Sequence, residues 1–380
     1  MKSLRLFKEI GQIDDALIYE AETIQTHFGF YLKYPWAKGL IPAAALLLLF
    51  ISVLFLKWPS KKLPDELPLL SVSLNISEGM GFEGCMAFSI DELENGNPWT
   101  ENMSLSTLPV FKNPLQNGGL NEKEMFDTAT SFAKALGLEI LDRNLQTPVE
   151  NSPEYNMAAL TCEGIRIETN TSGETTIWFD PAIQIPDFTG NPAQINTRSQ
   201  ALSVLNILME KYPPIHQMDD PKEKLFGDYN IFAQRNFILS AYESGDDPVT
   251  QILGFNFNTV TFSLDEQGKL FIIRRFKQDL SQKLGDYPII STEKAKQLLL
   301  NGHFITTVYE DMPAEDRIGS MELVYRTGRF EEVFMPYYRF WIELPSMEQE
   351  NGLQTFGAYY VPAVEEQYLT ELPLWDGSFN

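Results

Sequence analysis

An uncharged apolar stretch of 18 residues, from Gly39 to Leu56, constrains this chain more than any other feature. As a helix it would be about 27 Å long, which is close to the hydrocarbon thickness of a bilayer. Lysines flank the stretch, and aromatic rings, which settle at the depth of lipid headgroups, stand near both of its ends. These aromatic residues are Tyr34, Trp36 and Trp58. We therefore expect a single transmembrane helix at residues 39–58.

A cleaved signal peptide is the main alternative interpretation of this stretch. The 38 residues before it are far more than an ordinary signal-peptide leader contains, and no small-x-small cleavage site follows Leu56. We expect an uncleaved signal anchor with a tail at residues 1–38. Residues 59–68 contain three prolines and no periodicity, which predicts a linker to a large domain.

The charge of the chain is distributed unevenly. The formal net charge is −23, and the first 56 residues hold five basic and five acidic residues, so the whole excess lies beyond them. Such a negative surface repels nucleic acid and anionic headgroups. A nucleic-acid partner is therefore not expected.

The chain has two cysteines, Cys85 and Cys162. So few cysteines in a large exterior domain favour a bacterial surface over a eukaryotic one, where disulfides are denser. One disulfide bond and two buried free thiols are both compatible with the sequence.

The tail carries apolar residues at spacings of three and four, which predicts an amphipathic helix. Acidic residues lie beside this stripe and argue against an anionic membrane surface. Two interpretations remain: the stripe lies on the inner leaflet or on nothing in particular, or it docks into a groove of a cytoplasmic partner. The candidate partner-binding residues are Ile13, Leu17, Ala21 and Ile24.

Beyond the linker, three capped helices are each followed by strand patterns. The helices are expected from Asn121 to Gly137, from Thr197 to just before Pro213, and from Ser291 to Gly302. The strands are expected at residues 164–169, 175–180, 252–264, 269–276, 321–326, 337–345 and 356–364.

This order predicts an α+β fold class: one N-terminal transmembrane helix, then an exterior domain of two or three modules, each a helix with an antiparallel sheet. The expected exterior modules are residues 69–190, 191–285 and 286–380.

Two resemblances rest on these patterns. The alternation of helix and antiparallel strands resembles the PepSY-like modules of bacterial exported proteins and the exterior domains of the YycH and YycI regulators, above all in YPIISTEKAKQLLLNGHF followed by PYYRFWIEL. The tail at residues 10–21 is similar to the G-x-I-D-D-x-x-I-x-E-A stretch of clostridial single-pass proteins, some of them suspected anti-sigma partners. The second resemblance implies a cytoplasmic tail and an extracellular C-terminal domain at the cell membrane. Neither brings catalytic residues.

Two short motifs match catalytic signatures only in part. Gly79 to Gly84 matches the dinucleotide fingerprint, but the strand-like CMAFSI follows instead of a helix, so we expect a glycine-rich hairpin. Ser291 to Lys294 fits the S-x-x-K of penicillin-recognising serine enzymes, and residues 326–328 approximate their K-T-G. The S-D-N between them is missing, and a serine that caps a helix explains Ser291.

The sequence offers few residues that could form a metal or cofactor site. The three histidines are far apart, and the pairs at residues 219–220 and 246–247 lack the rhythm of a calcium loop. We expect no catalytic residue, no cofactor and no metal ion. The aromatic strands near residues 337–341 and 356–360 either pack into a core on both faces or expose one face to a protein or glycan.

The sequence therefore predicts a non-enzymatic regulatory or sensing protein of a Gram-positive-type bacterium. Its exterior domain would bind a protein or an envelope ligand, and its tail an intracellular or membrane partner. An anchored binding module without signalling is the alternative, and a cell-envelope enzyme is the third.

Overall fold

The computed structural model divides into two units, residues 1–66 and residues 67–380. It describes residues 67–75, 81–185, 195–309, 312 and 314–377. The expected tail, its four partner-binding residues and the expected transmembrane helix at residues 39–58 lie outside the described residues. All elements below belong to the second unit.

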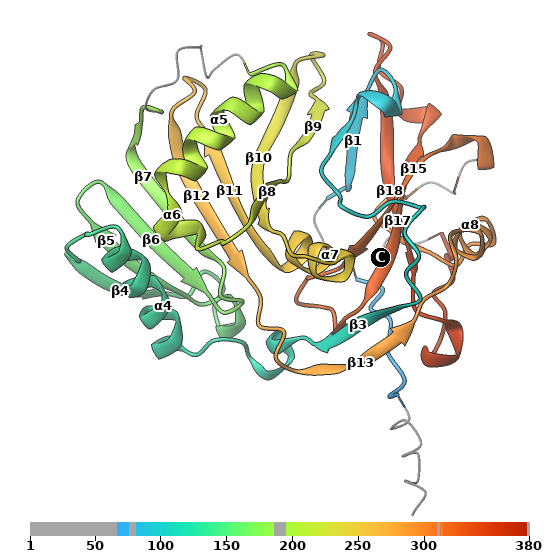
Figure 1. Cartoon of the computed structure of the whole chain (residues 1–380), viewed down its shortest axis with the longest axis horizontal. Coiled ribbons are helices and arrows are strands. Elements are labelled where there is room, and N and C mark those ends of the chain that lie inside the picture. Colours follow the sequence, from blue (N-terminus) through green and yellow to red (C-terminus); the bar gives the residue numbers. More distant parts are fainter. Residues whose placement is uncertain (1–66, 76–80, 186–194, 310–311, 313, 378–380) are drawn as a thin grey trace, which may run out of the picture. The chain divides into compact units, whose positions relative to one another are not determined.

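The larger of the sheets has ten strands in the order β2-β9-β10-β11-β12-β7-β6-β5-β4, with β8 paired to β10 (Figure 1). All pairs between its strands are antiparallel. In sheet order the bounds are β2 (Glu94–Asn95), β9 (Phe226–Tyr229), β10 (Arg235–Glu243), β11 (Asn258–Leu264), β12 (Leu270–Lys277), β7 (Thr175–Ile183), β6 (Ile165–Asn170), β5 (Met157–Cys162), β4 (Asp142–Gln146) and β8 (Pro221–Glu223).

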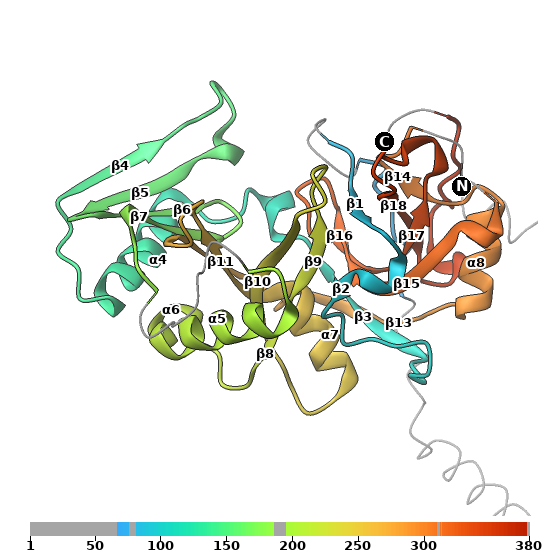
Figure 2. The ribbon, with the colours of Figure 1, turned by 90° about the horizontal axis from the view of Figure 1, so that it is seen from above.

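Helices α4 (Glu122–Ala135), α5 (Arg198–Lys211) and α6 (Pro213–His216) cover one face of this sheet (Figures 1 and 2). Strand residues alternate between the two faces, so Ile167 is buried under the helices while its neighbour Arg166 is exposed. The resulting core is almost wholly aliphatic and aromatic.

A second antiparallel sheet, here called the C-terminal sheet, has the order β1-β18-β17-β15, with β14 paired to β18. A third sheet joins β13, β3 and β16, and α8 (Thr292–Leu300) packs beside β18. The bounds are β1 (Gly84–Ala87), β18 (Gln354–Pro362), β17 (Pro336–Glu343), β15 (Ile318–Tyr325), β14 (Ile305–Thr306), β13 (Lys283–Pro288), β3 (Thr107–Lys112) and β16 (Val333–Phe334). Short 3-10 turns occupy Ile90–Glu92, Pro114–Asn117, Pro153–Tyr155, Glu315–Arg317, Pro345–Met347 and Glu366–Tyr368.

The aromatic residues of β17 and β18 are buried on both faces of the C-terminal sheet. Tyr338 and Phe340 enter one hydrophobic core, and Tyr337 and Trp341 enter another. Of the two interpretations of these strands, packing on both faces is the one observed.

Helix α7 (Pro248–Phe257) packs against β10, β11 and β15 and lies between the two sheets (Figure 1). It begins where Asp247 accepts hydrogen bonds from the Val249 and Thr250 amides, with a proline in the first turn. The strand predicted at residues 252–264 is therefore wrong in its first half, because residues up to Phe257 are helical. The sequence does mark this helix start, because an aspartate that can cap a helix is followed directly by a proline, which is favoured in the first turn.

The three predicted helices are confirmed. Asn121 and Thr197 form capping boxes at the starts of α4 and α5, and the Ser291 side chain caps α8 by accepting from the Lys294 amide at 3.2 Å. The hairpins β6–β7 and β11–β12 are confirmed as well.

The predicted fold class is wrong. The structure is mixed α/β and is built mostly of strands, and no helix among the described residues is long and apolar enough to cross a membrane. The expected transmembrane helix is thus not found among the described residues, and the expected separate modules are corrected by the way the sheets are built. The larger sheet pairs β7 of the first expected module with β12 of the second, and β3 pairs with β13 and β16 from later in the chain. Strands pair where their apolar faces fit in space, and sequence order does not reveal this.

Both cysteines are free and buried. Cys85 lies in the core of the C-terminal sheet, whereas Cys162 lies in the core of the larger sheet. Burial raises the pKa of both thiols, so neither is a reactive thiolate at neutral pH.

Candidate functional site

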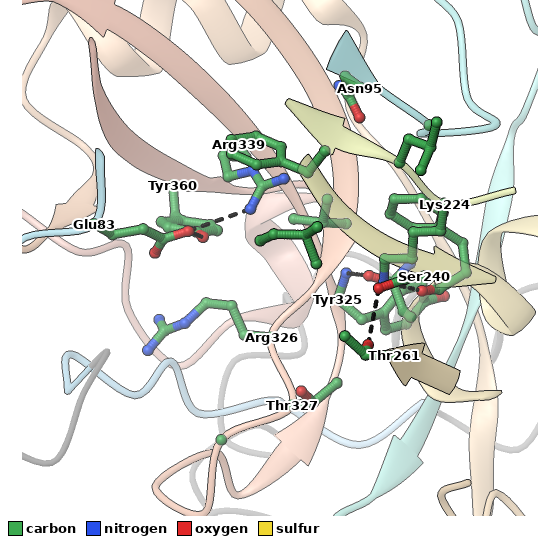
Figure 3. A pocket seen from close by; sticks show the side chains of 18 of the residues that line it. Glu83, Asn95, Lys224, Ser240, Thr261, Tyr325, Arg326, Thr327, Arg339 and Tyr360 are labelled. Atoms are coloured by element: carbon green, nitrogen blue, oxygen red, sulfur yellow. Dashed lines mark hydrogen bonds and ion pairs between the residues drawn. The ribbon is translucent and has the colours of Figure 1, made fainter. Parts of the chain in front are cut away.

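A cavity of about 500 Å³ lies where the larger sheet, helix α7 and the C-terminal sheet meet (Figure 3). Strands β10 and β11 supply one part of its wall, and β15, β17 and β18 supply another. This volume is within the usual range of small-molecule sites. We call it the inter-sheet cavity.

Arg339 of β17 is the centre of a hydrogen-bonded charge network at this cavity. Its guanidinium binds Glu322 of β15 through Nε at 3.0 Å and also through Nη2, and it donates to Glu83 Oε1 at 3.2 Å. Tyr360 of β18 donates its hydroxyl to the same Glu83 oxygen at 2.6 Å. Glu322, only 3% exposed, also accepts from the Trp341 indole at 2.7 Å. Antiparallel register places these groups together, because Arg339 pairs with Glu322 on one side and with Tyr360 on the other.

A second charge pair forms the wall beyond β15. Arg326 contacts Glu331 at 2.6 Å, and both side chains are buried. The same guanidinium donates to the carbonyl oxygens of Ser73 at 2.9 Å and of Asn75 at 2.5 Å. Burial raises the pKa of Glu331 to about 7, against the opposing effect of Arg326.

Lys224 follows β8 and brings its amino group to the opposite part of the wall. Its Nζ donates to the Phe255 carbonyl at 2.5 Å and lies 4.1 Å from the centre of the Phe255 ring. That carbonyl belongs to the last turn of α7, where helical partners are missing and a cation is favoured. Burial, with a smaller contribution from Arg339, lowers the pKa of Lys224 to about 7.

Hydroxyl groups lie beside Lys224. Ser240 Oγ and Thr261 Oγ1, from β10 and β11, are 2.8 Å apart, and both residues line the cavity. In Figure 3 Lys224 and this hydroxyl pair lie on one side of Arg339, and Glu83 and Tyr360 lie on the other. The cavity therefore has a donor-rich end and an end with a carboxylate.

The charged groups differ in how much bonding capacity they retain. Arg339 and Arg326 are held by carboxylates and carbonyls, so their charge is largely balanced within the protein. Among the described residues the Lys224 ammonium makes one hydrogen bond, and it has three donors, so two remain for a ligand. Glu83 uses Oε1 for both of its side-chain bonds, which leaves Oε2.

Only some of the residues that the sequence motifs single out line this cavity. The last residue of the glycine motif, Gly84, begins strand β1, and this strand pairs with β18, so the described residues do not show the expected hairpin. Glu83, the residue before it, lines the cavity. Residues 326–328 of the partial K-T-G match line the cavity, whereas Ser291 caps α8. Sequence reasoning missed Lys224, Glu322 and Arg339. A lone arginine within the aromatic strand PYYRFWIEL was a signal for a buried ion pair.

Metal ligands do not gather in the part of the chain that the structure describes: no three His, Cys, Asp or Glu side chains there are placed to hold an ion. Asp247, of the acidic pair at residues 246–247, caps α7.

Comparison of the sequence with known protein families and with curated proteins finds no match. The resemblances to PepSY-like modules, to YycH and YycI, and to clostridial tail sequences therefore stay predictions.

Proposed function

We propose that residues 67–380 form the ligand-binding domain of a non-enzymatic regulatory protein, and that the inter-sheet cavity takes a small zwitterion of the size of an amino acid or dipeptide. The observation that carries this proposal is the separation of free bonding capacity at the two ends of the cavity. Two donors of Lys224 and the Ser240–Thr261 hydroxyls suit a carboxylate. Glu83 Oε2 suits an ammonium group.

The balance of charge favours a carboxylate over a phosphate. Lys224 is the cation with donors to spare, and Glu83, Glu322 and Glu331 lie at or behind the wall. One lysine offsets a single negative charge, whereas the second charge of a phosphate would face these acids.

The binding role, as opposed to catalysis, is supported by how the acids and bases are used. Glu322 is held by Arg339 and Trp341, and Glu331 by Arg326, which is an arrangement that rigidifies a wall. A regulatory role is supported by Arg326, because this wall residue also holds the carbonyls of Ser73 and Asn75 near the start of the domain. A ligand that shifts Arg326 would shift that segment.

The test is calorimetric titration of the full chain with three probes: glycylglycine, N-acetylglycine and glycinamide. We expect glycylglycine to bind best, since N-acetylglycine lacks the ammonium group and glycinamide lacks the carboxylate. Lys224→Met keeps the aliphatic stem over the Phe255 ring and is expected to weaken glycylglycine and N-acetylglycine about tenfold or more, the loss of a charged hydrogen bond. Glu83→Gln should weaken glycylglycine and glycinamide, which carry the ammonium group, and leave N-acetylglycine unchanged.

Lys222→Met is the matched control, because Lys222 is exposed on β8 two residues from Lys224 and is not part of the cavity wall. Glycylglycine recovered unchanged by mass spectrometry supports binding without catalysis. The proposal fails if none of the probes binds, or if Lys224→Met and Lys222→Met bind glycylglycine equally.

A further inference from the structure

We propose that the inter-sheet cavity selects a ligand with a large apolar side chain on the residue that carries the carboxylate, and that Phe226 and Ile238 determine this specificity. The inference rests on the function proposed above and names the ligand more closely. A dipeptide of two glycines has no side chain and fills only part of a cavity of about 500 Å³. The wall beside the donor-rich end decides what fills the rest.

Strand register places an apolar pair directly beside the donors. The Lys224 amide donates to the Ser240 carbonyl at 2.7 Å, and in the same antiparallel register Phe226 pairs with Ile238. Side chains two residues apart on a strand point to the same face and lie about 7 Å apart. All four residues line the cavity. The apolar pair is therefore the next step of the wall after the proposed carboxylate site.

Ile238 is 52% exposed although it lies within β10, which has β9 on one side and β11 on the other. Its neighbours Phe237 and Leu239 point to the opposite face and pack into the core under the helices. The exposed surface of Ile238 is thus on the cavity face. Phe226 is partly buried there, with its ring centre 6.3 Å from that of Trp341. A ligand that covers this pair removes apolar surface from water, which stabilises the complex.

The positions of the charged groups assign the apolar side chain to the C-terminal residue of a dipeptide. In the proposed arrangement the carboxylate lies at Lys224 and the Ser240–Thr261 hydroxyls, and the ammonium group reaches Glu83 on the other side of Arg339 (Figure 3). A side chain next to the carboxylate starts close to the apolar pair, whereas one next to the ammonium group starts near Glu83. Ile238 also borders a hollow that continues along β10 and β11, so a leucine or phenylalanine side chain has room.

A polar or charged side chain gains nothing at this position. The side chains of Phe226 and Ile238 form no hydrogen bonds, so a polar group placed against them would lose water without compensation. Asp228 is the next residue of β9 on this face, but it lines neither the cavity nor the adjoining hollow. A basic side chain therefore finds no carboxylate there.

The experiment is calorimetric titration of the full chain with dipeptides that differ in one side chain. Glycylleucine should bind about tenfold more tightly than glycylglycine, because part of the leucine side chain is buried. Glycylglutamine, glycyllysine and leucylglycine should bind no better than glycylglycine. N-acetylleucine should exceed N-acetylglycine by the same factor as glycylleucine exceeds glycylglycine, since the apolar contact does not involve the ammonium group.

Ile238→Thr keeps a β-branched side chain on the strand and removes part of the apolar surface. It should weaken glycylleucine about threefold and leave glycylglycine unchanged. Because Ile238 is exposed in the free protein, the variant is expected to fold. Leu141→Thr is the matched control, since Leu141 is 63% exposed and lies outside the wall of the cavity.

The outcomes separate this inference from the proposed function. If glycylglycine binds but glycylleucine binds no more tightly, the specificity is wrong and the zwitterion site stands. The inference is also overturned if leucylglycine shows the same gain, if glycylglutamine or glycyllysine binds best, or if Ile238→Thr and Leu141→Thr bind glycylleucine equally. If no dipeptide binds, both proposals fail.

Discussion

The larger sheet and the C-terminal sheet hold buried charges by different means. The larger sheet packs an apolar core under α4 and α5, and its two buried charged residues are each held separately: Arg275 by backbone and amide oxygens, and Glu168 by the Trp178 indole and the exposed Arg166. The C-terminal sheet buries Glu322 between Arg339 and Trp341, and Arg326 beside Glu331. Apolar groups need only to leave water, whereas buried charges need partners of defined geometry.

The difference decides where a ligand can bind. An apolar core can repack around small changes in shape. A buried ion pair holds its groups in one place, and at the edge of such a network a neighbouring group such as Lys224 retains unused donors. The inter-sheet cavity lies where the charged network of the C-terminal sheet meets the larger sheet.

The largest effect is expected from breaking the charge network. Arg339→Met leaves the Glu322 carboxylate buried without its cation and should lower the free energy of unfolding by about 4 kcal/mol. Chemical denaturation measures this loss. The double variant Arg339→Met with Glu322→Gln should recover about half of it, because no unpaired charge remains buried. If the two changes instead add, the network does not act as a unit.

The matching change in the other core is Leu160→Ala. Removing this fully buried side chain should cost about 3 kcal/mol through lost burial and the remaining cavity. The affinity of the inter-sheet cavity for glycylglycine should not change, since Leu160 lies in a different core. A large loss of affinity would show that the two regions are coupled.

A smaller effect is expected where the two regions meet, at Gly254 of α7. A Cβ there would lie 1.7 Å from the Glu243 carbonyl oxygen of β10, so Gly254→Ala should cost about 2 kcal/mol by pushing α7 away. Affinity should fall as well, because α7 carries Phe255. Gly285→Ala is the control: its Cβ would meet the flexible end of Leu67, which can move. Equal costs for both variants would contradict the reasoning.

The smallest effect is expected from a change in pH of one unit. The cationic form of Lys224 binds a carboxylate, and its pKa is about 7, so affinity for N-acetylglycine should fall as pH rises above 7, by at most about tenfold per pH unit. The groups that face Lys224 are Arg339 from β17, Glu322 from β15 and the Phe255 carbonyl from α7.

Glu331, whose pKa is also about 7, ionises over the same range and acts in the same direction, because it adds negative charge to the wall. Lys224→Arg keeps its charge at all these pH values and should flatten the pH dependence. An affinity that rises with pH would contradict the assignment of Lys224 to a carboxylate.

Local structure followed from short-range patterns. Asn121 with Glu124, and Ser291 at the start of α8, marked helix starts because a cap is satisfied within one turn. The hairpin β11–β12 followed from alternation on both sides of a glycine turn. Helix α7 was mistaken for a strand because its apolar residues form a short run, in which helix and strand look alike.

The candidate site was not predictable in the same way. Glu83, Lys224 and Arg339 are more than a hundred residues apart from one another, and the sequence shows Glu83 and Lys224 as ordinary surface charges. Strand register between β15, β17 and β18 brings Glu322, Arg339 and Tyr360 side by side.

What the sequence by itself determined is therefore the set of local elements: three capped helices, the hairpins and the aromatic strands. Only the tertiary structure decided that strands from distant segments share sheets, that both cysteines stay free in separate cores, and that a charged cavity forms beside α7. The physical reason is the distance along the sequence over which each interaction acts. Caps and turns are satisfied within a few residues, whereas sheet order, burial and the pairing of charges depend on which apolar faces fit together across the whole chain.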